Sequence, residues 1–353
     1  YEKLAIDKLG ITKIEEHKNK RPLGKTDYAY AMAEGIPKDF PIHTRGDNKD
    51  LGPIVKRRFP SSLGGGALGN DLSSGRLDLA NRIVDPKNPM TARVMVNRIW
   101  AWHFGQGIVN TPNDFGNYGA APTHPELLDY LALKFIQNGW SIKHMHRMIM
   151  GSATYQQSAR SDPGPKKYAG FERRRLSAEE IRDTILSVSG RLDMTPGKGH
   201  PFPPRSKWNF TQHNPFADEY ASNKRSIYLM RKRNQISTFF GLFDGPDPNA
   251  STARRSQTTV PSQALYFMND PFFHDCAEQF ASDIRSIGPD QRLDHACQQL
   301  FSRPATQADH EDFGSFTAAM APTISNDPEK LNTEIWRSYA RVLMSSNEFL
   351  YLD

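Results

Sequence analysis

The sequence lacks the features that most quickly reveal a function. Only two of its 353 residues are cysteines, and neither lies in a CxxC or CxxCH motif, which excludes covalent attachment of a c-type haem within this chain. No run of about 18 apolar residues occurs, so we predict no membrane-spanning helix. The GxSxG and P-loop patterns are absent too, and with them the common signatures of a nucleophile elbow and a phosphate-binding loop.

The chain also lacks a strong excess of one charge. Its 45 Lys and Arg against 39 Asp and Glu give a formal net charge of +6, which is typical of ordinary solvated surface when spread over such a length. Only residues 224–233 combine dense basic charge with aromatic side chains, so we predict no nucleic-acid partner. The sequence begins at Tyr1 without an apolar signal segment, and we expect an export signal upstream of it.

Helical periodicity and capping signals predict a mainly α fold, with a multi-helix core, long loops rich in Pro and Gly, and a small β element. Ser177 and Glu180 have the spacing of a capping box. Ser226–Met230 reads as a short strand. We predict four segments: an extended, loop-rich part over 1–73, a helical core over 74–192, a loop-rich part with short strands and a basic cluster over 193–261, and a C-terminal helical part over 262–353 that packs on the core.

The two cysteines have symmetrical positions. The spacing predicts helices over Pro271–Arg285 and Asp290–Phe301, joined by a short turn that lies midway between Cys276 and Cys297. In an antiparallel helical hairpin, residues at equal distances from the turn lie opposite each other, so a disulfide is geometrically possible and would fit an oxidising compartment. The alternative is two buried free thiols, because cysteine is often simply buried.

Ionisable and amide side chains gather at two further places. In the alternating stretch Ile42–Asp47, His43, Arg45 and Asp47 would share one face of a strand, either as a binding site or as a surface ion-pair ladder. The second group is Asn97 and Arg98, on an otherwise apolar and aromatic helix, with Asn113 and Asp114 in the loop beyond. A buried polar group must be hydrogen-bonded. These residues therefore either fix the loop to the helix or form a ligand site.

Metal ligands are sparse in the sequence. Asp244, Asp247 and Asn249 place three oxygen side chains in one turn, which suits a calcium ion, although a loop held by Asx-turns explains the same pattern. His144 and His146 lie two apart on a predicted helix and point about 200° apart, so they cannot bind one ion together. We predict no cofactor within this chain beyond the calcium alternative.

The densest basic region suggests an anionic ligand. Its candidate residues are Arg225, Arg231, Arg233, Arg254 and Arg255. Arginine forks bind sulfate, carboxylate or phosphate groups in bidentate fashion, so a groove for an anionic polysaccharide is one interpretation. The other is that these arginines bridge the helical core to its long loops.

Several stretches together resemble one family. They are Leu77–Ala80, Asn88–Trp100, His103–Gly107, Asn113–Gly116, Pro122–Asp129, Gly139–Ser141, Ser152–Ser158, Arg173–Leu176, Arg182–Asp183, Pro261–Leu265, Asn269–Pro271 and Ser346–Phe349. This combination resembles a planctomycete-specific C-terminal domain of unknown function found in exported, cytochrome-c-like multidomain proteins. The resemblance implies export, upstream partner domains in the same parent protein and a haem outside this chain. It implies no catalytic residues.

Three functional hypotheses follow. The first is a non-catalytic structural or binding module of a large exported bacterial protein, which contacts partner domains or an anionic polysaccharide. The second is a polysaccharide-active enzyme domain that uses His43, Arg45 and Asp47 with the Asn113–Asp114 loop. The third is an accessory domain that packs beside a c-type cytochrome domain in electron transfer. We favour the first, because the recognisable positions are mainly helix caps, helix faces and turns.

Overall fold

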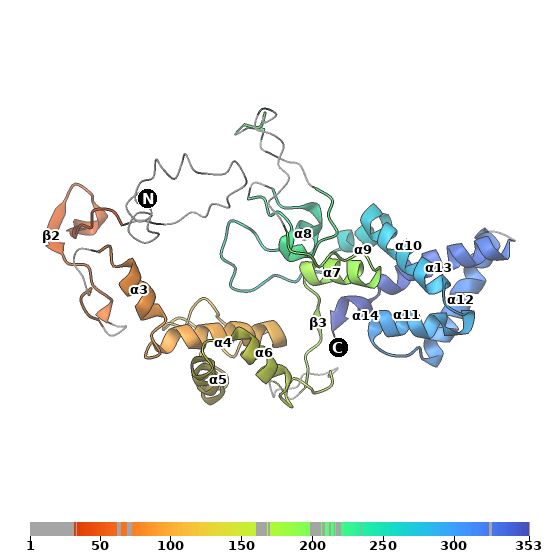
Figure 1. The fold of residues 1–353 in the computed structure, drawn as a ribbon, viewed down its shortest axis with the longest axis horizontal. Coiled ribbons are helices and arrows are strands. Elements are labelled where there is room, and N and C mark those ends of the chain that lie inside the picture. Colours follow the sequence, from red (N-terminus) through yellow and green to blue (C-terminus); the bar gives the residue numbers. More distant parts are fainter. Residues whose placement is uncertain are drawn as a thin grey trace, which may run out of the picture. The chain divides into compact units, whose positions relative to one another are not determined.

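The structure is a computed structural model. It describes residues 32, 34–61, 65–68, 73–159, 168, 170–197, 206, 209–211, 213–214, 216, 220–233, 235–324 and 327–352. Helices dominate the regular structure of these residues, and strands form only two short antiparallel pairs among them (Figure 1). This confirms the predicted mainly α class. The chain separates into two compact units, one of Tyr1–Val96 with Asp129–Trp140 and the other of Asn97–Leu128 with Ser141–Asp353.

The first unit contains a hairpin, one complete helix and parts of two others. Strands β1 (Phe40–His43) and β2 (Leu51–Val55) pair antiparallel and are followed by α3 (Arg76–Ile83). Two longer helices, α4 (Pro89–Phe104) and α5 (Pro125–Gln137), each run into the second unit. Within the first unit an ion pair of 2.6 Å between Arg93 Nε and Asp129 Oδ1 joins α4 to α5.

The second unit holds the remaining elements. In chain order they are α6 (Ile142–Met150), β3 (Arg174–Arg175), α7 (Ala178–Val188), the 3₁₀ turn η4 (Ser226–Tyr228), α8 (Thr238–Leu242), α9 (Pro261–Asn269), α10 (Pro271–Arg285), η5 (Pro289–Gln291), α11 (Arg292–Phe301), α12 (Gln307–Ile324), α13 (Pro328–Met344), α14 (Asn347–Leu350) and β4 (Tyr351–Leu352). The strands β3 and β4 pair antiparallel, so Tyr351 and Leu352 lie beside the segment that leads into α7.

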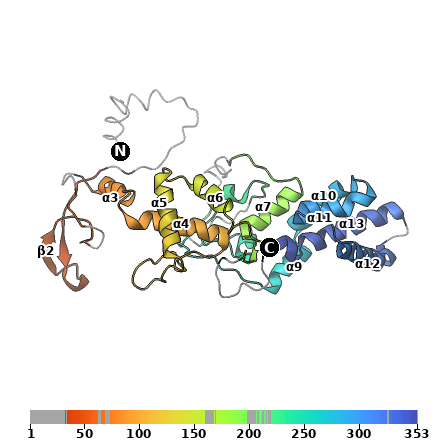
Figure 2. The ribbon, with the colours of Figure 1, turned by 90° about the horizontal axis from the view of Figure 1, so that it is seen from below.

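The core of this unit forms chiefly between α10 and α13, which lie side by side in both ribbon views (Figure 2). Along α10 the side chains of Phe273, Phe280 and Ile284 recur at helical spacing and are completely buried. On α13, Trp336 and Tyr339 occupy the corresponding buried stripe. Apolar periodicity alone therefore sets which face of each helix turns inward.

Helix α7 begins as predicted. The Ser177 hydroxyl accepts a hydrogen bond from the Glu180 amide at 3.4 Å, and the Glu180 carboxylate accepts one from the Ser177 amide at 2.7 Å. This reciprocal arrangement is a complete capping box. It fixes where the helix starts, and so fixes the position of the acidic residues in its first turn.

The predicted strand over Ser226–Met230 is wrong. Ser226–Tyr228 forms a 3₁₀ turn instead. The amide and the hydroxyl of Ser226 both donate to Asp183 Oδ1, at 2.8 and 2.7 Å. Because these bonds hold Ser226 against α7, the segment follows the helix and does not extend into a sheet.

The proposed disulfide is also absent, since Cys276 and Cys297 are both free and fully buried. Cys276 on α10 turns toward the end of α7, where Arg191 Nη1 lies 3.9 Å from its sulfur. Cys297 on α11 lies in the electrostatic environment of Asp309 and Tyr339. Helix α10 packs more on α13 than on α11, and the two cysteines have different surroundings.

We expect both thiols to be unreactive in the folded protein and free after unfolding. Burial raises the pKa of Cys276, and it raises the pKa of Cys297 to about 11, so little thiolate forms at neutral pH. Titration with a thiol-reactive dye should show slow labelling in buffer and two labelled thiols per chain in denaturant without reductant. If no thiols are labelled in denaturant until a reductant is added, the two cysteines form a disulfide after all.

Candidate functional site

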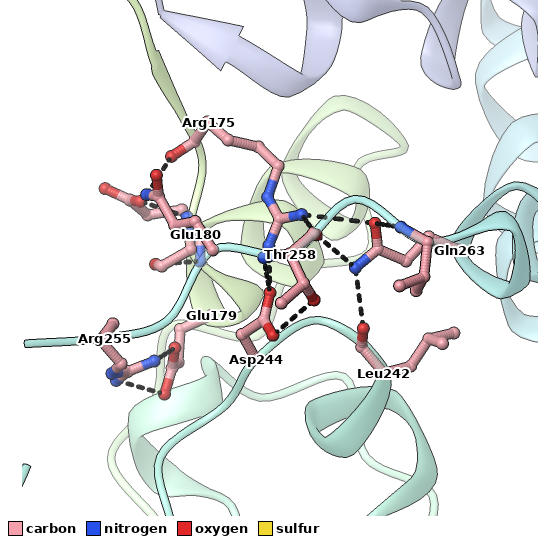
Figure 3. Close-up of polar contacts among 11 residues, drawn as sticks. Arg175, Glu179, Glu180, Leu242, Asp244, Arg255, Thr258 and Gln263 are labelled. Atoms are coloured by element: carbon pink, nitrogen blue, oxygen red, sulfur yellow. Dashed lines mark hydrogen bonds and ion pairs between the residues drawn. The ribbon is translucent and has the colours of Figure 1, made fainter.

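An almost buried ion pair joins two segments of the second unit. Arg175, the last residue of β3, places its Nη2 atom 2.7 Å from Oδ2 of Asp244, and the two side chains are 7% and 13% exposed (Figure 3). Arg175 Nη1 also donates to the Thr258 carbonyl and, at 3.3 Å, to Gln263 Oε1. One guanidinium group therefore binds residues that lie far apart in the sequence.

The backbone conformation of Asp244 directs its side chain toward Arg175. Its φ of 59° lies in the left-handed region, which Asp tolerates better than most residues, and it lies two residues after the end of α8. Its carboxylate also accepts hydrogen bonds from the amide and the hydroxyl of Thr258, each at 2.8 Å. Burial acts to raise the pKa of Asp244, but the bonds from Thr258 and Arg175 outweigh it and lower the pKa, so the carboxylate is ionised at neutral pH.

The first turn of α7 carries a second set of ion pairs. We call Arg174, Glu179, Glu180, Arg231 and Arg255 the α7 charge cluster. Arg255 binds Glu179 through two hydrogen bonds of 2.8 and 3.1 Å, and Arg231 Nη2 lies 3.2 Å from the same carboxylate. Arg174 binds Glu180 through two bonds of 3.1 Å. The guanidinium of Arg231 lies 3.6 Å from the centre of the Phe240 ring.

The two carboxylates of this cluster are ionised. Burial acts to raise the pKa of Glu179, but Arg255 and Arg231 lower it overall, and Arg174 with Ser177 has the same effect on the pKa of Glu180. The start of a helix favours negative charge as well, because unpaired amides point toward it. The cluster is therefore an arrangement of permanent charges that joins loops to α7.

The predicted basic region divides into two groups. Arg231 and Arg255 belong to the α7 charge cluster, and Arg225 Nε lies 3.7 Å from Oδ2 of Asp183 on α7. Arg233 and Arg254 are exposed, and within the described part of the chain no side-chain partner contacts either of them. The bridging interpretation thus accounts for three of these arginines, and two remain available to a ligand.

Sequence reasoning missed the two buried arginines. Arg175 and Arg182 are 6% and 8% exposed, and Arg182 Nη1 donates to the Lys224 carbonyl at 2.9 Å. Both residues lie in stretches that carry the family resemblance. The resemblance was the only sign in the sequence that these two arginines matter, because no local pattern distinguishes a buried arginine from an exposed one.

The calcium candidates are bound to protein groups. Asp244 is held by Arg175 and Thr258, the Asp247 carboxylate accepts the Asn249 amide at 2.8 Å, and Asn249 Nδ2 donates to the Arg233 carbonyl at 2.6 Å. The bond between Asp247 and Asn249 is an Asx-turn. Among the residues that the structure describes, no group of three His, Cys, Asp or Glu is placed to hold a metal ion.

The Asn97 group fixes a loop. Asn97 is completely buried on α4 and forms two bonds with the Val109 backbone, its Nδ2 donating at 3.0 Å and its Oδ1 accepting at 2.8 Å. Arg98 Nη2 donates to Asn113 Oδ1 at 2.7 Å. The carboxylate of Asp114 accepts the Gly116 amide at 2.8 Å within the loop's own turn. These contacts hold the loop against the end of α4.

The prediction that His43, Arg45 and Asp47 share one face of a strand is wrong. Strand β1 ends at His43, and Thr44–Gly46 forms a 3₁₀ turn in which Arg45 has a φ of 53° and Gly46 a φ of 82°. The chain therefore reverses at this point, and the three exposed side chains lie around a hairpin turn.

A histidine pair was not foreseen. His103 Nε2, at the end of α4, lies 2.8 Å from His146 Nδ1 on α6, and the Tyr155 ring packs edge-on against His103 with a centroid distance of 5.3 Å. Burial lowers the pKa of His103, and the neighbouring His146 and Arg174 lower it further. No local spacing joins these histidines, because they meet only through the packing of the second unit.

The fold and the site define a mainly helical protein whose loops are fixed by arginine–carboxylate pairs. The chain belongs to the family described as "Protein of unknown function (DUF1553)", which matches residues 75–317. No curated protein and no solved structure matches the chain. Within the described residues, every helix is too short or too polar to cross a bilayer.

We expect Asp244→Asn to destabilise the protein strongly. The substitution keeps the shape of the side chain and its tolerance of positive φ, but it leaves the buried Arg175 without a countercharge, which typically costs about 3–5 kcal/mol. The free energy of unfolding from urea titrations measures the effect. Asp247→Asn in the same loop is the matched control and should change stability by about 0.5 kcal/mol or less. Equal losses in the two variants would show that the buried pair has no special role.

The stability of the protein should fall in mild acid because of His103. Its pKa is lower in the folded chain than in the unfolded chain, so unfolding takes up a proton as the pH drops through about 6.5. We expect the thermal midpoint to fall less between pH 7.5 and 5.5 in His103→Gln than in the wild type. His295→Gln, at an exposed position on α11, should leave the pH dependence unchanged. A parallel decline in all three proteins would contradict this assignment.

Proposed function

We propose that the chain is a non-catalytic binding module of a large exported bacterial protein, and that its basic loops hold an anionic polysaccharide. One observation carries the proposal: Arg233 and Arg254 remain exposed at the margin of the α7 charge cluster. Because Arg231 and Arg255 bind the same Glu179 carboxylate, the segments that carry Arg233 and Arg254 lie beside each other. We infer that the two exposed arginines belong to one surface.

The charge of this surface suits an anionic polymer. Glu179 pairs with both Arg231 and Arg255, and the same two segments also carry Arg233 and Arg254, so positive charge is in excess there. Planar arginine forks match the geometry of sulfate and carboxylate groups, which recur along acidic polysaccharides. Such contacts are exposed and weak one at a time, so binding depends on several of them and weakens with salt.

The lowered pKa values of the nearby carboxylates favour a binding role over a catalytic one. A general acid needs a pKa near the working pH, which usually means one raised by its surroundings. The pKa values of Glu179, Glu180 and Asp244 are all lowered instead, and each carboxylate is engaged by an arginine. We infer that these groups build the surface and do not transfer protons.

Partner domains are a second class of ligand. Helix α3 has no buried residue, and Leu77, Leu79 and Ile83 on it are 71%, 50% and 45% exposed. Exposed apolar groups of this kind are typical of surfaces that pack against another domain. We propose that they contact upstream domains of the same exported parent protein, which on the sequence resemblance is a planctomycete protein with a cytochrome-c-like domain.

The double variant Arg233→Gln/Arg254→Gln should bind a sulfated polysaccharide more weakly. Removing two exposed ionic contacts should reduce affinity roughly 2- to 30-fold. Retention on immobilised heparin, recorded as the salt concentration of elution, measures the loss. Lys143→Gln/Arg147→Gln on α6 is the matched control, because it removes the same charge from other exposed positions. Equal shifts in both double variants, or equal retention on neutral dextran, would contradict the proposal.

A further inference from the structure

A hollow of ≈ 470 Å³ lies among four helices of the second unit, and its lining shares no residue with the α7 charge cluster. Its lining comes from α9, α10, α12 and α13, which gather in the C-terminal part of the chain (Figure 1). The volume falls within the range of small-molecule binding sites. The lining is mostly apolar, and it includes Phe267, Met268, Phe316, Met320 and Val342.

The walls of the hollow combine fixed and adaptable groups. Phe267 is 7% exposed and packs against the Phe273 ring with a centroid distance of 4.9 Å, while Phe316 packs on Tyr339 at 5.1 Å. Met268, in contrast, is 67% exposed. Methionine side chains are flexible and polarisable, so they adapt to ligands of irregular shape. A hydrocarbon chain would therefore contact packed aromatic side chains on one part of the hollow and flexible methionine side chains on another.

One arginine gives the hollow its charge. Arg341 on α13 lines it and donates from Nη2 to the Ser338 hydroxyl at 3.0 Å. Arg337, one turn earlier, binds Glu278 and Glu334, but Arg341 has no carboxylate partner within the described part of the chain. The lining contains no acidic residue, and its other ionisable group is His274, whose Nε2 lies 3.3 Å from the Phe267 carbonyl. The electrostatic preference is therefore for an anion.

We propose that this hollow binds an amphipathic carboxylate, a molecule with one carboxylate group and an unbranched hydrocarbon chain. The carboxylate would accept hydrogen bonds from the Arg341 N–H groups that Ser338 does not use, and the chain would lie on Phe267, Phe316 and Val342. Arginine and carboxylate form strong bidentate pairs. The hollow and the basic loops are separate sites, so each proposal stands without the other.

Titration calorimetry with decanoate, decanol and decyltrimethylammonium tests the proposal. Decanoate should bind the wild type with a stoichiometry of one per chain, and more tightly than either the neutral or the cationic compound of equal chain length. Arg341→Gln should weaken decanoate binding roughly tenfold or more, because it removes hydrogen bonds to a charged group. It should change decanol binding little.

Two further variants separate the site from general effects. Arg341→Lys keeps the charge but loses the planar fork, so it should retain a preference for decanoate over decanol at reduced affinity. Arg147→Gln removes an exposed charge on α6, outside both proposed sites, and should bind decanoate as the wild type does. Equal binding of decanoate and decanol, unchanged affinity in Arg341→Gln or no saturable binding would each overturn the proposal.

Discussion

The buried contact between Arg175 and Asp244 links three distant parts of the chain. Arg175 ends β3, which pairs with β4 at the C-terminus, and it stands directly before the capping box of α7. Asp244 follows α8, and its carboxylate binds the amide and the hydroxyl of Thr258 in the loop that leads to α9. Taking two charges out of water is unfavourable, so the pair is stable only because Thr258 and Gln263 satisfy most of its remaining hydrogen-bonding groups. These bonds fix the path of the loop that joins α8 to α9.

At the start of α7, ion pairs likewise fix the basic loops. Its capping box fixes Glu180, and the first turn of the helix stabilises the negative charges of Glu179 and Glu180 through its unpaired amides. Those carboxylates then bind Arg174 of β3 and, from the loops before and after α8, Arg231 and Arg255. A helix cap that is local in sequence thereby sets the position of loops far along the chain, among them the segments that carry Arg233 and Arg254.

Local features of the fold could be predicted from the sequence, and tertiary ones could not. The periodicity of α10 and the capping box of α7 depend on residues within one or two turns, so both were predicted. The His103–His146 pair and the Arg175–Asp244 pair join residues 43 and 69 positions apart, and no pattern in the sequence connects them. The predicted strand at Ser226 failed for the same reason, because its hydrogen bonds to Asp183 are tertiary. At His43 a local signal was present, since the Gly46 that follows at positive φ forms the turn.

The arginines of this protein differ in the source of their countercharge. Arg175 and Arg255 find carboxylates on other segments of the chain, and their side chains serve mainly to hold those segments together. Arg337 and Arg341 lie one turn apart on α13, yet only Arg337 has carboxylate partners within the described residues. A guanidinium whose partner is supplied by the chain contributes to stability and loses most of its capacity for other anions. One that lines an apolar hollow without such a partner keeps that capacity, because a bound carboxylate would supply the charge that the fold does not.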